Sequence, residues 1–112
     1  MSGSKAQTCI VVGGFILGAG AAWAIDPPLH VVSQAGRAFS PTEIAIQRGE
    51  TVQIVNDDGD LLHHVFIESD RMNFDSGDQK PGSRTNIVFS VAGHFTVLCA
   101  IHPKMKLQVG VR

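Results

Sequence analysis

One short segment near the C-terminal end of the chain carries three side chains that bind soft metal ions. In the segment C-A-I-H-P-K-M, residues 99–105, a thiol, an imidazole and a thioether follow one another at intervals of three residues. A further imidazole, from His63 or His64, is available about 35 residues upstream. Two imidazoles, one thiolate and a weakly bound thioether are the ligand set of an electron-transfer copper site. The spacing therefore predicts a copper site made by Cys99, His102, Met105 and one of the two adjacent histidines.

Each of these residue types has a more ordinary role when it occurs alone. A buried Cys packs as a small hydrophobe, Met fills gaps in cores, and a single His is most often a hydrogen-bonded core or surface residue. The copper interpretation rests on their order, because one short turn between two predicted strands supplies three ligands in sequence.

The first 24 residues have the pattern of a secretory signal peptide. Lys5 precedes an apolar stretch over residues 9–19, and Ala22-Trp23-Ala24 is an A-x-A cleavage site. The apolar stretch is short for a membrane span, and an uncleaved N-terminal anchor is the alternative. We expect a signal peptide over residues 1–24, a single domain over residues 25–112, and export to a periplasm-like compartment.

The composition of residues 25–112 narrows the function further. This part carries eight of the nine Lys and Arg residues and all ten Asp and Glu residues, a formal net charge of −2 with neutral His. Such a charge indicates neither nucleic acid nor an anionic membrane as partner, and we expect a monomer. Cys99 is the only cysteine left after cleavage, so it has no internal disulfide partner, and metal binding is its simplest use.

Short runs of β-branched and aromatic residues, separated by turn residues, predict an all-β fold, a small Greek-key β-sandwich. The expected strands cover residues 29–34, 44–46, 51–56, 63–68, 85–90, 94–99 and 106–111, with an irregular segment over residues 69–84. Val52 and Ile54 should face one side of their strand. His63 begins one expected strand and Cys99 ends another, so a sandwich can bring both to the same end.

The chain resembles the cupredoxins, the small blue-copper proteins, and among them the amicyanin-like proteins of methylamine utilisation. The Cys-x-x-His-x-x-Met spacing with Pro directly after His carries the resemblance. Further agreement comes from Phe39-Ser40-Pro41, from residues 48–52, from Asn56-Asp57-Asp58 and, more weakly, from Phe74-Asp75 with Lys80-Pro81-Gly82. The resemblance covers essentially all of residues 25–112.

By position, the resemblance implies copper with His63, Cys99 and His102 as equatorial ligands and Met105 as the axial ligand. Family members usually have His-Asn-Val where this chain has His63-His64-Val65, which favours His63 over His64. Adjacent side chains of a strand also point to opposite faces, so only one of the two histidines can face the metal.

Two positions depart from the family pattern. The family often ties the Asn after its first His to a Ser or Thr after its Cys, whereas this chain has His64 and Ala100 there. His64 is interpreted either as a surface residue or as a titratable neighbour of the site. Asp57, Asp58 and Asp60 are interpreted as a solvated turn, and His30 and His94 as structural or surface residues.

The resemblance implies a one-electron carrier and not an enzyme. His102 would be the exposed ligand, with Ile101 and Pro103 in a docking patch, and Lys104 and Lys106 steering an acidic partner. A methylamine-dehydrogenase-type donor and a c-type cytochrome acceptor are the implied partners. The alternative is a periplasmic copper-handling protein; an enzyme would need an open coordination position, which Met105 takes up.

Overall fold

Alternation of apolar and polar residues accounts for most of the strands. The structure is a computed structural model that describes residues 28–112, so the predicted signal peptide lies outside the described residues. The strands are β2 (Leu29–Gln34), β3 (Phe39–Ser40), β4 (Glu43–Ile46), β5 (Glu50–Asn56), β6 (Val65–Glu68), β7 (Asn73–Asp75), β8 (Arg84–Phe89), β9 (Gly93–Cys99) and β10 (Lys106–Val111). Over the described range, no helix has the length and apolar character needed to cross a membrane.

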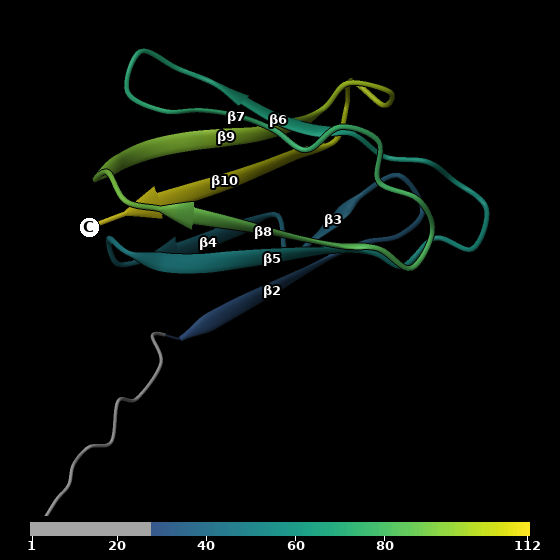
Figure 1. The fold of residues 1–112 in the computed structure, drawn as a ribbon, viewed down its shortest axis with the longest axis horizontal. Helices are drawn as coiled ribbons and strands as arrows, with labels where there is room; N and C mark the ends of the chain where they lie inside the picture. The colour runs from purple at the N-terminus through teal and green to yellow at the C-terminus, as the bar shows by residue number, and fades with distance from the viewer. Residues whose placement is uncertain (1–27) are drawn as a thin grey trace, which may run out of the picture.

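The strands form two sheets packed face to face. One sheet has the order β4-β10-β9-β6-β7 and the other has the order β3-β2-β5-β8. Each sheet is mixed, since β10 pairs with β4 and β2 pairs with β5 in parallel, while the remaining pairs are antiparallel. Figure 1 shows the two layers, with β9 and β10 in one and β2 and β5 in the other. The predicted all-β sandwich is confirmed.

The inward-facing side chains of both sheets form one continuous core. Val52 and Ile54 are both fully buried in it, as their alternation along β5 predicts. Cys99 and Met105 belong to the same cluster, because β9 and the segment leading into β10 turn these residues inward. The core therefore extends directly to the predicted ligands.

Two expectations about the strands are wrong. The expected irregular segment contains β7, a three-residue edge strand that pairs with β6. The strand expected from residue 63 begins only at Val65, because the backbone of His63 pairs with Gln79 in an isolated bridge instead of continuing along β9.

The connections that carry the predicted ligands gather at one end of the sandwich. The β2–β3, β5–β6 and β9–β10 connections all lie at the right-hand end of Figure 1, opposite the C-terminus. His63 lies in the second of these connections and His102 in the third, so the fold brings together residues that are far apart in the chain.

Candidate metal centre

Three donor side chains meet at this end of the sandwich. The Nδ1 atoms of His63 and His102 each lie 3.8 Å from Sγ of Cys99, and they lie 3.3 Å from each other. The three ligand atoms fall within 4.8 Å of one another. His63 and Cys99 are buried and His102 is half-buried, so the group opens toward solvent through His102.

Backbone pairing fixes the first two donors. Cys99 ends β9 and pairs there with Val65 of β6. His63 exchanges two backbone hydrogen bonds with Gln79, its N–H donating over 3.1 Å and its carbonyl accepting over 2.7 Å. These two residues are therefore held by strand-like backbone, as a preformed site requires.

The other two predicted ligands come from the short connection between β9 and β10. The N–H of Met105 donates to the carbonyl of His102 over 3.0 Å, which closes a tight turn. Met105 is almost completely buried and packs in the same core cluster as Cys99. The turn thus places an imidazole near the surface and a thioether beneath it.

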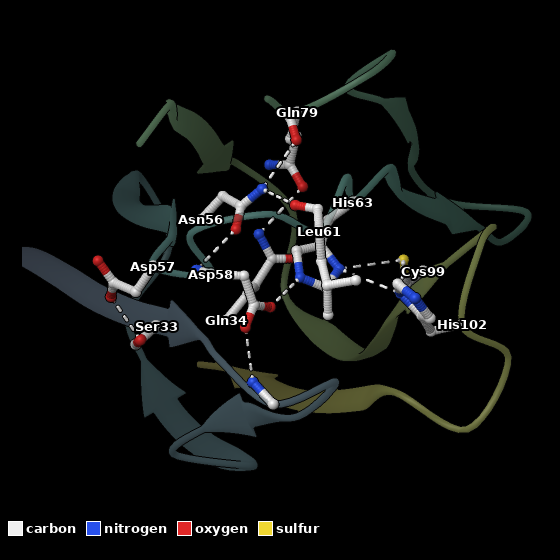
Figure 2. A network of polar contacts seen from close by, with 11 residues as sticks. Ser33, Gln34, Asn56, Asp57, Asp58, Leu61, His63, Gln79, Cys99 and His102 are labelled. Carbon is white, nitrogen blue, oxygen red and sulfur yellow. Dashed lines mark hydrogen bonds and ion pairs between the residues drawn. The ribbon is translucent and has the colours of Figure 1, made fainter. Parts of the chain in front are cut away.

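His63 has a carboxylate on the side of its ring that faces away from Cys99. Its Nε2 lies 2.6 Å from Oδ2 of Asp58, and Oδ1 of Asp58 accepts a hydrogen bond from the N–H of Gly36 over 2.9 Å (Figure 2). The expectation that Asp58 belongs to a solvated turn is wrong, because its side chain is 12% exposed and points at His63. Asp57 is exposed and bonds to Ser33 instead.

Buried amides support the same region, and the sequence interpretation missed them. Nδ2 of Asn56 donates to the carbonyls of Leu61 and Gln79, and Nε2 of Gln34 donates to Oε1 of Gln79 over 3.1 Å. Gln79 also donates to Oγ1 of Thr85. One signal could have revealed Gln34: it stands two residues after Val32, on the inward face of β2.

His64 points away from the donor cluster. Its Nε2 lies 2.6 Å from Oδ1 of Asp75, and its Nδ1 lies 3.6 Å from Oδ1 of Asp78. The side-chain link that the family often has between these two positions is absent here. The two positions are joined by a backbone hydrogen bond instead, in which the N–H of Ala100 donates to the carbonyl of His64 over 2.8 Å. The other two histidines lie away from the cluster: His30 contacts Glu50, and His94 is exposed.

The surroundings lower the pKa of both Asp58 and His102, which favours the charged form of Asp58 and the neutral form of His102. The hydrogen bond with His63, followed by that from Gly36, lowers the pKa of Asp58 and keeps it ionised. Burial, and then the nearby charges of His63 and Arg37, lower the pKa of His102 and favour its neutral form. A neutral imidazole is the form that binds a metal ion.

An open hollow surrounds the exposed edge of His102. It is lined by Arg37, Ile101, His102, Pro103, Lys104 and Met105. Ile101 is 42% exposed, a large fraction for an aliphatic side chain. Arg37 was not anticipated here: the β2–β3 turn brings it in with φ at 59°, a left-handed conformation that a non-glycine residue rarely adopts.

The donor set fits copper. A thiolate is a soft ligand that favours Cu(I), and imidazole binds both oxidation states. The three donor atoms converge from separate elements at a buried position, and the buried thioether of Met105 packs in the same hydrophobic core as Cys99. The chemistry of these side chains therefore agrees with the predicted copper site.

Comparison with known proteins supports the fold. No family model matches the sequence, and no curated protein is similar to it. Among solved structures, a copper-containing nitrite reductase from Thermus scotoductus SA-01 superposes with a TM-score of 0.73 and 30% identity over 85% of this chain. The chain spans only 25% of the length of that reductase.

Smaller proteins match over most of their own length. A purple cupredoxin from Nitrosopumilus maritimus has a TM-score of 0.65 and 23% identity, over 74% of this chain and 99% of its own. A variant of amicyanin in its reduced form has a TM-score of 0.70 and 23% identity, over 82% of this chain and 90% of its own.

These matches show that the chain has the fold of the cupredoxins, as its resemblance to that family predicts. Amicyanin is among the cupredoxins that it matches, and the cluster of His63, Cys99, His102 and Met105 is consistent with a blue-copper member of the class.

Proposed function

We propose that this protein is a one-electron carrier with a single copper ion bound by His63, Cys99, His102 and Met105. The observation that carries the proposal is the convergence of one sulfur and two imidazole nitrogens at a buried point, with one imidazole reaching the surface. Bound copper would supply a Cu(I)/Cu(II) couple, so that an electron is stored without making or breaking a substrate bond.

The surrounding chain contributes rigidity. His63 is held by its backbone pairing with Gln79, and Cys99 is held by the pairing of β9 with β6. A site held by backbone pairing on both sides changes little when the charge on the metal changes, and fast electron transfer needs little rearrangement. His102 links this rigid interior to the surface, so its exposed edge is the path for the electron.

Docking of a redox partner would occur over the hollow around His102. Ile101 and Pro103 are exposed and give it apolar surface, while Arg37 and Lys104 place positive charge at its edge. Lys106 adds a further exposed cation in the same part of the chain. Small apolar contacts with charged rims suit partners that must dissociate quickly.

The proposal includes a cellular setting and partners. We propose that the protein acts as a monomer in the periplasm after removal of residues 1–24, and that it carries electrons from a dehydrogenase to a c-type cytochrome. We also propose that it is a carrier and not an enzyme, because the buried Met105, as the proposed axial ligand, would fill the position where an enzyme needs an open ligand site.

The first experiment is to load the protein with Cu(II) and record its visible absorption and EPR spectra. Intense thiolate-to-copper charge transfer with a narrow copper hyperfine splitting is the expected result. Stopped-flow oxidation by hexacyanoferrate(III) then measures electron exchange. A pale tetragonal spectrum would contradict the proposed site. A blue protein that exchanges electrons slowly but releases copper readily would favour the copper-handling alternative.

A further inference from the structure

The second nitrogen of His63 has a partner that the ligand set does not explain. His63 is fully buried, and its Nε2 lies 2.6 Å from Oδ2 of Asp58. In the described part of the chain, the polar contacts of the His102 ring are with Cys99 and His63 only. The two histidines are therefore not equivalent, because only His63 has a carboxylate behind it.

The direction of the hydrogen bond follows from the other bond that Asp58 makes. Oδ1 of Asp58 accepts from the N–H of Gly36 over 2.9 Å, which suits an ionised carboxylate. An ionised carboxylate has no proton to donate, so the proton of the 2.6 Å contact lies on Nε2 of His63. In the neutral imidazole, which is the form that binds a metal ion, this leaves Nδ1 of His63 without a proton, and Nδ1 is the atom that faces Sγ of Cys99 and Nδ1 of His102.

The position of Asp58 is itself determined by the fold. Its N–H donates to Oδ1 of Asn56 over 3.0 Å, and Asn56 is buried and bonded to the carbonyls of Leu61 and Gln79. The Gly36 bond ties the other carboxylate oxygen to the β2–β3 turn. Asp58 is thus held from both sides while it contacts His63, as Figure 2 shows.

We propose that Asp58 is a positioning residue that keeps His63 ready to bind copper through Nδ1 and lowers the reduction potential of the site. A carboxylate on the outer nitrogen fixes the tautomer of a ligand histidine and makes the ligand nitrogen more basic. Its fixed negative charge in a poorly hydrated position also favours the more positively charged oxidation state of the metal. Only the effect on the reduction potential rests on the proposed function, because the hydrogen bond between Asp58 and His63 is present without copper.

Asp57 provides a matched control. It is the preceding residue of the same turn and carries the same charge, but it is exposed and bonds to Ser33. Asp57→Asn therefore removes one nearby charge without touching His63. Asp58→Asn removes the charge that contacts the ring but retains an oxygen that can accept its hydrogen bond, and Asp58→Ala removes both.

The first test uses the copper-free protein. Proton–nitrogen NMR of wild type should show a strongly downfield Nε2–H signal from His63 that exchanges slowly with water. In Asp58→Ala this exchange should become at least about tenfold faster, while Asp57→Asn should match wild type. Absence of the slowly exchanging signal in wild type would overturn the proposal, even if the alanine variant fails to fold.

The second test uses the copper-loaded protein. Asp58→Asn should raise the reduction potential, and the ratio of Cu(I) to Cu(II) affinity should rise by about tenfold. A potential equal to that of Asp57→Asn would overturn the role of the carboxylate charge. If the NMR result holds but wild type shows no blue-copper spectrum, the proposed function fails while the Asp58–His63 contact remains.

Discussion

The Nδ1 atoms of His63 and His102 lie 3.3 Å apart, although the residues are separated by 39 positions in the chain. Two unprotonated nitrogens at this distance repel each other, and a proton on one nitrogen or a metal ion between the two relieves that repulsion. When the proton of a neutral His63 lies on Nε2 beside Asp58, the proton that can lie between the rings is one on Nδ1 of His102. A metal ion bound at this point then takes the place of that proton.

Replacement of Cys99 by Ser should abolish the intense visible colour of the copper-loaded protein. The colour requires charge transfer from sulfur, and the hydroxyl of serine cannot supply it. Visible absorption at matched copper content measures the effect. Ala100→Ser is the control, because Ala100 is the next residue and is exposed. Colour that survives in Cys99→Ser would remove Cys99 from the site.

Replacement of Met105 by Leu should leave copper bound and raise the reduction potential. The axial sulfur is a weak donor that tunes the potential, and its loss disfavours Cu(II). Leu and Met have similar volumes, so the change in the buried core should cost less than about 1.5 kcal/mol of unfolding free energy. Voltammetry and copper analysis measure the two quantities. Loss of copper from the variant would show that Met105 is more than a weak axial ligand.

Replacement of Arg37 by Gln should slow electron exchange with the anion hexacyanoferrate(III), by about threefold at low ionic strength. Arg37 lines the hollow around His102, so its charge attracts anions to the exposed imidazole. The difference from wild type should shrink as salt is added. Arg48→Gln is the control, because Arg48 pairs through its backbone with Arg112, at the C-terminal end of the sandwich. Equal effects of the two substitutions would exclude a local role for Arg37.

Replacement of Gln79 by Ala should destabilise the metal-free protein by about 2 kcal/mol. It removes the acceptor of the Gln34 amide and the donor to Thr85, and thereby leaves buried polar groups without partners. Thermal or urea unfolding measures the loss. Gln53→Ala is the control, because the side chain of Gln53 bonds to the exposed side chains of Asn86 and Arg84. A loss no larger than in Gln53→Ala would contradict a structural role for the buried amides.

Replacement of Glu50 by Gln should reduce the amount by which the unfolding free energy falls at acid pH. A hydrogen bond from the backbone of Gln47, and then one with His30, lower the pKa of Glu50 below its ordinary value of 4.5. The unfolded chain then binds more protons than the folded one near this pH, so stability is present above about 4.5 and is lost as the pH falls through the folded pKa.

Urea unfolding of the metal-free protein between pH 6 and pH 3 tests this expectation about Glu50. The unfolding free energy of Glu50→Gln should fall less steeply with acid than that of wild type. Glu43→Gln is the matched control, since Glu43 is an exposed carboxylate on β4. Parallel pH profiles for wild type and Glu50→Gln would contradict the predicted contribution.

The sequence predicted the strands with regular alternation and the ligand turn, because both depend on residues close together in the chain. β10 was predicted with its observed bounds for this reason. The three-residue strand β7 has too few residues to show a period of two, and it exists only because β6 lies beside it. The inward orientation of Asp58 could not be predicted either, since it depends on His63 and Gly36 being brought to the same place.

The position of β10 in its sheet limits when this sheet and the turn that carries the proposed ligands can form during folding. β10 is the last strand in the sequence, yet it lies between β4 and β9 and pairs with both. Among the described strands, β4 has no neighbour in this sheet until residues 106–111 have folded, and until then the turn carrying His102 and Met105 has no second strand to anchor it. A chain truncated before β10 would thus keep all four proposed ligands but leave that turn unanchored, so we expect the metal site to form only after residues 106–111 have joined the sheet.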